Sequence, residues 1–192
     1  MSDVLLLSIP TRIMQISRLG GSMTYKLEFV TALPDPPAFQ ALMVEYYQIM
    51  IDKLVGAGGP TLSAVDLACD AMDHLDELTP PEGRILLATQ SDGALVGCGV
   101  LRKIRADAAE LKRMYVRPSA QGSGLGRQLF ETRIAEARKM GCTALYADTI
   151  TGNTAMLSMY ERFGFRYIAR YPENANAPEL DPYLVYLELK LA

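Results

Sequence analysis

The residues best suited to chemistry lie in a glycine-rich segment between Met114 and Arg127. Three glycines, Gly122, Gly124 and Gly126, follow a strand-like run that ends at Pro118 and precede a run of helical periodicity. Glycine leaves backbone amides open to a ligand, and the first amides of a helix are unpaired and carry the positive end of its dipole. The segment therefore predicts an anion site, with pyrophosphate as the expected ligand.

Two common phosphate motifs are excluded by spacing. The dinucleotide pattern G-x-G-x-x-G fails because Arg127 stands where the third glycine is required, and no Gly-Lys-Ser/Thr sequence supplies a P-loop. A plain tight loop at a helix start is the alternative interpretation. Charge favours the anion site, because residues 111–139 carry seven basic and two acidic side chains in a chain whose net charge is −3.

Composition limits the other chemistry that is open to the chain. Its 192 residues suit little more than one domain, and the negative net charge argues against a nucleic-acid partner. One histidine, His74, is too few for the usual zinc and iron sites, so we expect no metal. Three widely spaced cysteines indicate a reducing compartment.

Targeting signals are weak. The apolar run at 4–10 lacks a basic start, and no stretch approaches the roughly 20 apolar residues of a membrane span. We therefore expect a cytoplasmic protein with no membrane partner. Residues 1–23 are interpreted as an N-terminal extension and residues 24–192 as one domain.

Periodicity and the Gly/Pro positions predict alternating strands and helices. Strands are expected at 25–30, 84–90, 94–104, 109–117, 144–148, 165–170 and 183–191. Helices are expected at 38–55, 61–78, about 125–140 and 153–162. A hairpin-rich first half followed by β-α-β units indicates an α/β (α+β) fold with one mixed sheet flanked by helices.

The same residues resemble the GNAT family, the Gcn5-related N-acetyltransferases. Its signature Arg/Gln-x-x-Gly-x-Gly/Ala stands here as Gln121–Gly126, and Tyr115–Pro118 looks like the end of the family's fourth strand. Asn153–Phe165 looks like its second cofactor motif. The resemblance covers about 108–168 strongly and extends more weakly back to residue 24. It implies a mostly antiparallel sheet whose central strands splay apart.

The resemblance also implies the cofactor, acetyl-CoA, and where it binds. The pantetheine arm would pair with backbone near Met114 and Val116, and Asn153 would touch the pantetheine or the phosphates. The pyrophosphate would lie on the glycine-rich turn, whose expected binding residues are Gln121, Gly122, Ser123, Gly124, Gly126 and Arg127. For Asn153 a helix N-cap is the simpler interpretation, and both roles can coexist.

Acetyl transfer requires a neutral amine. For a lysine-like acceptor, forming the neutral amine at pH 7 costs roughly 4.6 kcal/mol, so a positioned base helps. By resemblance Glu110 is the candidate base and Tyr160 the candidate acid for the departing thiolate, while an amide near Met114 or Val116 would stabilise the oxyanion. The alternatives are a strand glutamate paired with Lys112 or Arg102, and a core aromatic.

By the same resemblance, the acceptor is expected to be a primary amine of a small molecule or peptide. Residues 60–82 carry six carboxylates and no lysine or arginine, which indicates either a cationic acceptor or a solvated helix face. The segment 172–182 is expected to form a loop over the cleft. Three tyrosines are expected to line that cleft: Tyr167, Tyr171 and Tyr183. A non-catalytic acyl-CoA sensor is the competing function, and a homodimer is left open.

Overall fold

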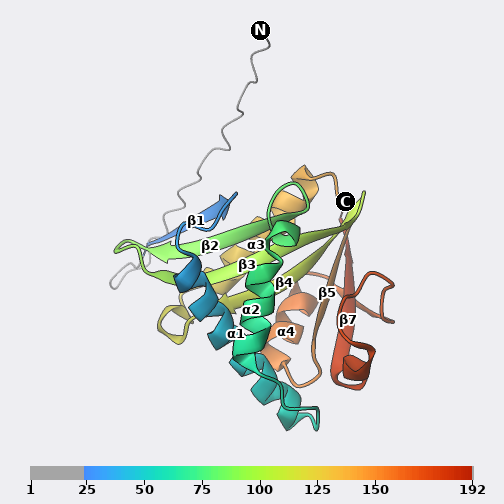
Figure 1. Ribbon diagram of the computed structural model, residues 1–192. Helices are drawn as coiled ribbons and strands as arrows, with labels where there is room; N and C mark the ends of the chain where they lie inside the picture. The colour runs from blue at the N-terminus through green and yellow to red at the C-terminus, as the bar shows by residue number, and fades with distance from the viewer. Residues whose placement is uncertain (1–23, 192) are drawn as a thin grey trace.

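The computed structural model describes residues 24–191, so the expected extension at 1–23 lies outside the described residues. Within this range the chain forms one sheet with helices on both faces (Figure 1). The sheet order is β1-β2-β3-β4-β5-β7-β6, and every neighbouring pair is antiparallel except β4 and β5. This arrangement confirms the predicted mixed, mostly antiparallel fold.

The strands of the described residues agree closely with the predicted ranges. They are β1 Tyr25–Val30, β2 Gly83–Gln90, β3 Leu95–Arg105, β4 Ala108–Val116, β5 Ala144–Ile150, β6 Arg166–Ile168 and β7 Leu184–Lys190. Only β6 is markedly shorter than expected. The chain leaves the sheet after Ile168 because Arg170 turns toward the following loop, where its guanidinium binds the carbonyl of Asn174.

The helices are α1 Pro36–Gly56, α2 Ala64–Asp73, α3 Leu125–Lys139 and α4 Thr154–Arg162. The helix expected at 61–78 is shorter at both ends: α2 begins at Ala64 and ends at Asp73, and Leu75–Leu78 form a separate 3₁₀ turn. Carboxylates crowd the carboxyl end of α2, where the helix dipole disfavours negative charge, and this explains the early end. Two further 3₁₀ turns, Pro118–Ala120 and Pro178–Tyr183, were not expected. No helix among residues 24–191 is long and apolar enough to cross a bilayer.

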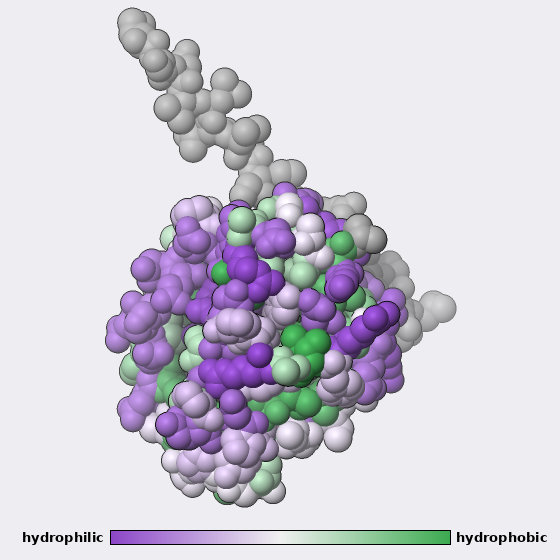
Figure 2. All heavy atoms as spheres, turned by 90° about the vertical axis from the view of Figure 1, so that its right-hand side faces the viewer, coloured by the Kyte–Doolittle hydropathy of each residue, from purple (hydrophilic) through white to green (hydrophobic). Residues whose placement is uncertain are grey.

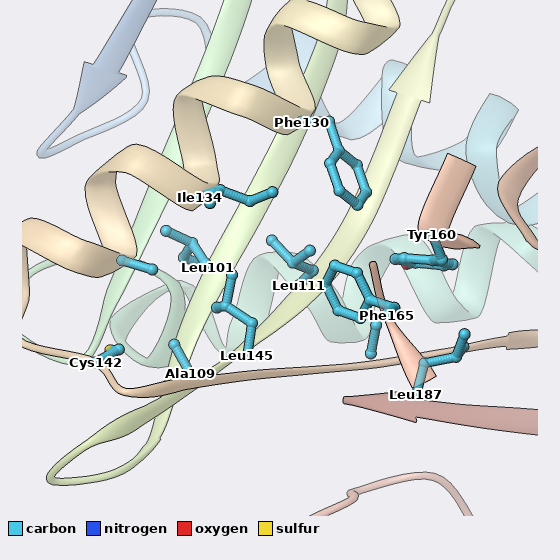
Figure 3. Close-up of a cluster of buried hydrophobic side chains, with 12 residues drawn as sticks. Leu101, Ala109, Leu111, Phe130, Ile134, Cys142, Leu145, Tyr160, Phe165 and Leu187 are labelled. Carbon is cyan, nitrogen blue, oxygen red and sulfur yellow. The ribbon is translucent and has the colours of Figure 1, made fainter. Parts of the chain in front are cut away.

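Each face of the sheet has its own hydrophobic core. Helices α1 and α2 cover one face, where Phe39 and Leu42 pack against Val100. Helices α3 and α4 cover the other face, where Phe130 and Ile134 lie over Leu101, Leu111 and Leu145 (Figure 3). Neighbouring β3 residues thus face opposite cores, as the two-residue period of a strand requires.

The surface beside the last strands is mainly polar. The view that faces the right-hand side of Figure 1 shows hydrophilic side chains over most of the molecule, with hydrophobic residues confined to small areas (Figure 2). Single exposed apolar side chains such as Tyr167, which is 51% exposed, are ordinary on a folded domain. This face therefore presents no broad apolar surface.

The central strands β4 and β5 stop pairing about halfway along their length. They pair only between Ala108–Leu111 and Ala144–Ala147, although both continue beyond these residues. On its other side β4 bulges, because Cys98 of β3 lies opposite Tyr115 and Val100 lies opposite Lys112. A bulge bends its strand, so β4 turns away from β5. The predicted splaying is confirmed.

A buried arginine holds the bulge. Arg133 of α3 is 1% exposed, and its Nη1 donates to the carbonyls of Val100 at 3.2 Å and Lys112 at 3.3 Å. Its Nη2 lies 2.9 Å from the sulfur of Met114. Burial lowers the pKa of Arg133 to about 10, so the guanidinium still carries its charge at neutral pH. One side chain thus ties β3 to both ends of the bulge.

We expect Gly99→Ala to destabilise the protein by about 1–3 kcal/mol. A Cβ at Gly99 would lie 2.6 Å from Arg133 Nε, and the guanidinium cannot withdraw without losing its carbonyl partners. Urea unfolding measures the change. The control is Gly56→Ala at the end of α1, where an added Cβ meets nothing within 4 Å and stability should hold or rise slightly. Equal unfolding midpoints for the two variants would contradict the prediction.

Candidate active site

The diverging ends of β4 and β5 open into a cavity of about 750 Å³. Leu111–Met114 line it from β4, and Asp148–Ile150 line it from β5. Helices α1, α2 and α4 and residues 175–184 complete the walls. A cavity of this size is typical of a small-molecule site. The predicted loop at 172–182 therefore does lie over the cleft, where Ala175–Ala177 contribute to the wall.

The glycine-rich turn presents free amides at the start of α3. Gly122 and Gly124 have φ values of 75° and 87°, in the left-handed region that favours glycine. A Cβ at either glycine would meet nothing within 4 Å, so the space beside them is open. Within the described residues, the amides of Gly122, Gly124 and Gly126 donate no hydrogen bond of ordinary geometry. These features fit a pyrophosphate group.

The other residues predicted for this turn shape it. The Gln121 side chain donates to the carbonyl of Val116 at 2.9 Å, and the Ser123 hydroxyl donates to the carbonyl of Ala120 at 2.6 Å. Gly126 faces β4, since a Cβ there would lie 3.5 Å from Met114 Cε. Arg127 is exposed and pairs with Glu131 at 2.7 Å. The turn is thus fastened to the end of β4.

The basic charge of residues 111–139 is less concentrated at the turn than the sequence suggested. Arg117 binds Glu45 of α1 at 2.8 Å, Arg133 is buried at the bulge, and Lys112 contacts Glu110. Among the basic residues of 111–139, Arg127 lies in the first turn of α3. Backbone amides and the helix dipole therefore carry most of the attraction for an anion.

Three of the predicted residues meet at the cavity: Met114, Asn153 and Tyr160. Asn153 is 5% exposed and occupies the N-cap position of α4, but its side chain caps nothing and donates to Thr149 Oγ1 at 2.9 Å. Tyr160 packs against Phe130 and Phe165, with ring centroids 5.5 and 5.0 Å away. Burial raises the pKa of Tyr160, which keeps its phenol protonated.

Glu110 lies in a buried ionic cluster and does not line the cavity. It is 0% exposed, and the hydroxyl of Tyr171 donates to its carboxylate. Arg102 Nη2 lies 3.1 Å from one carboxylate oxygen, and Lys112 Nζ lies 3.3 Å from the other. Both pairings that the sequence offered as the alternative are present, in a buried setting. Its proposed role as base stays a prediction.

Asp148 is the carboxylate of β5 that lines the cavity, and sequence reasoning missed it. Asn174 donates to Asp148 at 2.9 Å and also contacts Glu110 at 3.5 Å, so one amide links the two carboxylates. Burial raises the pKa of Asp148, Lys112 opposes that shift and Glu110 adds to it. A polar residue within an otherwise apolar strand was the available signal.

The outer wall of the cavity differs from the prediction. The three tyrosines expected there are absent from its described lining: Tyr167 is exposed, Tyr171 is buried against Glu110, and Tyr183 lies outside. Tyr171 packs with Tyr146 and Tyr186 in a separate small core. The tyrosines that do line it are Tyr46, Tyr47 and Tyr160. Of the six acidic residues at 60–82, only Asp70 and Glu77 reach the cavity.

Comparisons with known proteins agree with this geometry. A model of the Acetyltransferase (GNAT) family matches residues 44–165. The IAA acetyltransferase of Azospirillum brasilense is 35% identical over 118 residues, which cover 61% of this chain and 74% of that protein. An acetyltransferase from Streptococcus agalactiae shares the fold, with a TM-score of 0.67 and 22% identity over 86% of this chain and 98% of that one.

A GNAT family acetyltransferase from Elizabethkingia anophelis, solved with acetyl-CoA bound, has a TM-score of 0.55 and 20% identity over 87% of this chain and 98% of that one. The family match spans more than half of the chain, which therefore belongs to the GNAT family of acetyltransferases. It is an acetyl-CoA-dependent N-acetyltransferase that transfers acetyl groups to amines. These relatives give no support to a non-catalytic sensor.

We expect Arg127→Gln to weaken acetyl-CoA binding about two- to fivefold, because an exposed ion pair between Arg127 and a phosphate would contribute roughly 0.2–1 kcal/mol. Calorimetric titration at low and high salt measures the effect, which should shrink as salt rises. Arg138→Gln is the matched control, because Arg138 is exposed in the last turn of the same helix. Equal losses in both variants would show that Arg127 has no local role.

Proposed function

We propose that the protein acetylates the primary amine of a small molecule inside the cavity between β4 and β5. The observation that carries the proposal is that Asp148 and Tyr160 line the same cavity as the parted ends of the two strands. Residues 175–184 cover part of this cavity, which favours a small acceptor over a peptide. The cytoplasmic location and a homodimer stay predictions.

The residues of the glycine-rich turn fit the pyrophosphate of acetyl-CoA, and those between β4 and β5 fit its pantetheine arm. The amides of Gly122, Gly124 and Gly126 would hold the pyrophosphate, while Met114, Val116 and Asn153 would contact the pantetheine arm. When bound there, acetyl-CoA supplies an acetyl thioester for transfer. The chain's own task is to orient the amine, take its proton and exclude water.

Asp148 is placed to take the proton of the amine. Its carboxylate lines the cavity, and burial raises its pKa toward the range in which a base works well. Glu110 lies behind it in the network, joined through Asn174, and its negative charge makes Asp148 a stronger base. We therefore propose Asp148 as the residue that touches the amine and Glu110 as its positioning partner.

Tyr160 is placed to return a proton to the leaving thiolate. Its ring is fixed by Phe130 and Phe165, and its raised pKa means that the phenol keeps its proton at neutral pH. Burial and nearby charges shift the pKa of Tyr160, and no hydrogen bond from the described residues contributes to that shift. The phenol is therefore free to donate to a ligand.

Asp148→Asn is expected to lower kcat about 100-fold, as loss of a general base typically does. Because the pKa of Asp148 is raised, wild-type kcat should fall on the acid side at a higher pH than an exposed aspartate would give, and the variant should lose that limb. The folded state binds this proton more tightly than the unfolded chain, so ionised Asp148 costs stability as pH rises through its folded pKa. The variant should thus melt no lower than wild type at neutral pH.

The Glu110→Gln variant distinguishes the role of Glu110 from that of Asp148. It should lower kcat/KM while acetyl-CoA binding stays nearly unchanged, and it should move the acid limb to lower pH because Glu110 helps to raise the pKa of Asp148. The measurement is the pH–rate profile of the two variants side by side. If Glu110→Gln abolishes the limb and Asp148→Asn keeps it, Glu110 is the base.

Tyr160→Phe is expected to reduce kcat about 10- to 100-fold with little change in acetyl-CoA affinity or stability, because the ring and its packing remain. Steady-state kinetics followed by free-thiol release, with calorimetry for binding, provide the check. Full activity across the pH range would remove Tyr160 as the acid.

A further inference from the structure

The cavity contains a cation that the reaction does not use. Arg113 stands at the β4 bulge and lines the cavity beside Lys112 and Met114. Its φ of 48° lies in the left-handed region, which residues other than glycine seldom adopt. Such an outlier persists only where the surrounding structure fixes it, and here it lies within the bulge of β4.

Arg113 is the cation of this wall that lacks a counter-ion. Lys112 and Arg102 both contact Glu110, and Arg102 also lies 3.4 Å from Glu77. Arg113 forms no ion pair with any carboxylate of residues 24–191; its Nε donates to the Tyr47 hydroxyl at 2.9 Å. Its Nη1 is shielded from solvent and has no hydrogen-bond partner in the described part of the chain.

A guanidinium that lines a cavity without a counter-ion can pair with an anionic group of a ligand. A carboxylate is the matching partner, because guanidinium and carboxylate form charge-assisted hydrogen bonds with fixed geometry. Arg113 and Asp148 line one cavity from β4 and β5, so a single small molecule can reach both. Tyr46 lines the same cavity.

We propose that Arg113 binds a carboxylate of the acceptor, so that the substrate is an amine that also carries a carboxylate, as an amino acid does. This inference rests on the proposed function and deepens it. The carboxylate pairs with Arg113 while the amine faces Asp148. The acidic side chains Asp70 and Glu77 lie at the exposed margin of the cavity, where they disfavour an acceptor with extra negative charge.

The test compares amines that carry a carboxylate with the matching carboxamides. Three pairs serve as probes: L-leucine and L-leucinamide, L-methionine and L-methioninamide, and γ-aminobutyrate and its amide. Free-thiol release gives kcat/KM for wild type, Arg113→Gln and Arg113→Lys, with Arg138→Gln as the surface control. Calorimetry of acetyl-CoA and of each acid with its amide adds a readout independent of turnover, and melting temperatures report the fold.

Wild type should prefer at least one acid over its amide by about 10- to 100-fold, the range expected for a hydrogen bond to a charged group. Arg113→Gln should abolish that preference through KM and leave acetyl-CoA affinity unchanged, while Arg113→Lys should keep part of it. Equal rates for acid and amide in wild type, or equal losses for both in Arg113→Gln, would overturn the carboxylate site while the transferase function stands.

Thiol release from no amine at all would instead count against the proposed function. In that case calorimetry still decides the site: binding of an acid to wild type but not to Arg113→Gln supports it, and no binding to either rejects it. Weaker acetyl-CoA binding in Arg113→Gln would assign the residue to the cofactor and also overturn the inference.

Discussion

The separation of β4 from β5 after Leu111 is the constraint on which the rest of the structure depends. Strands in a sheet normally stay paired, because each unpaired backbone group that is buried costs free energy. Here the bulge at Arg113 turns β4 aside, and Arg133 from α3 satisfies carbonyls on both sides of it. The buried guanidinium thus stabilises the irregular backbone beside which the cavity opens.

The charged residues in and beside the cavity fall into two groups, those whose charge is paired within the protein and those whose charge is not. Glu110 is fully buried with Arg102 and Lys112 beside it, so its charge is compensated within the protein. Asp148 and Arg113 are the opposite case, since each faces the cavity with incomplete compensation. Incompletely compensated charges destabilise a fold, and their location in a cavity is typical of binding and catalysis.

Local patterns in the sequence were enough for the element order, the glycine-rich turn and, by resemblance, the splayed sheet. These patterns include strand alternation, helical spacing and glycines such as Gly141 and Gly164. Each acts within a few residues, so the secondary structure of a segment can be predicted from that segment alone. The roles of Asp148 and Arg113 depend on neighbours from distant segments, such as Asn174 and Tyr47. The early end of α2 was not predicted because the prediction followed the apolar periodicity and gave no weight to the carboxylates near the carboxyl end of the helix.

The walls of the cavity come from two kinds of segment. Its inner surface belongs to the stretch 108–168, which also carries the glycine-rich turn, whereas α1, α2 and residues 175–184 form the outer surface. Exchanges at residues 175–184 change this outer surface without altering the glycine-rich turn, whereas in α1 only the cavity-facing positions are open to exchange, because Phe39 and Leu42 belong to the core on the sheet. Chimaeras that swap these segments between relatives are therefore a direct route to altered acceptor choice, and natural divergence has the same freedom.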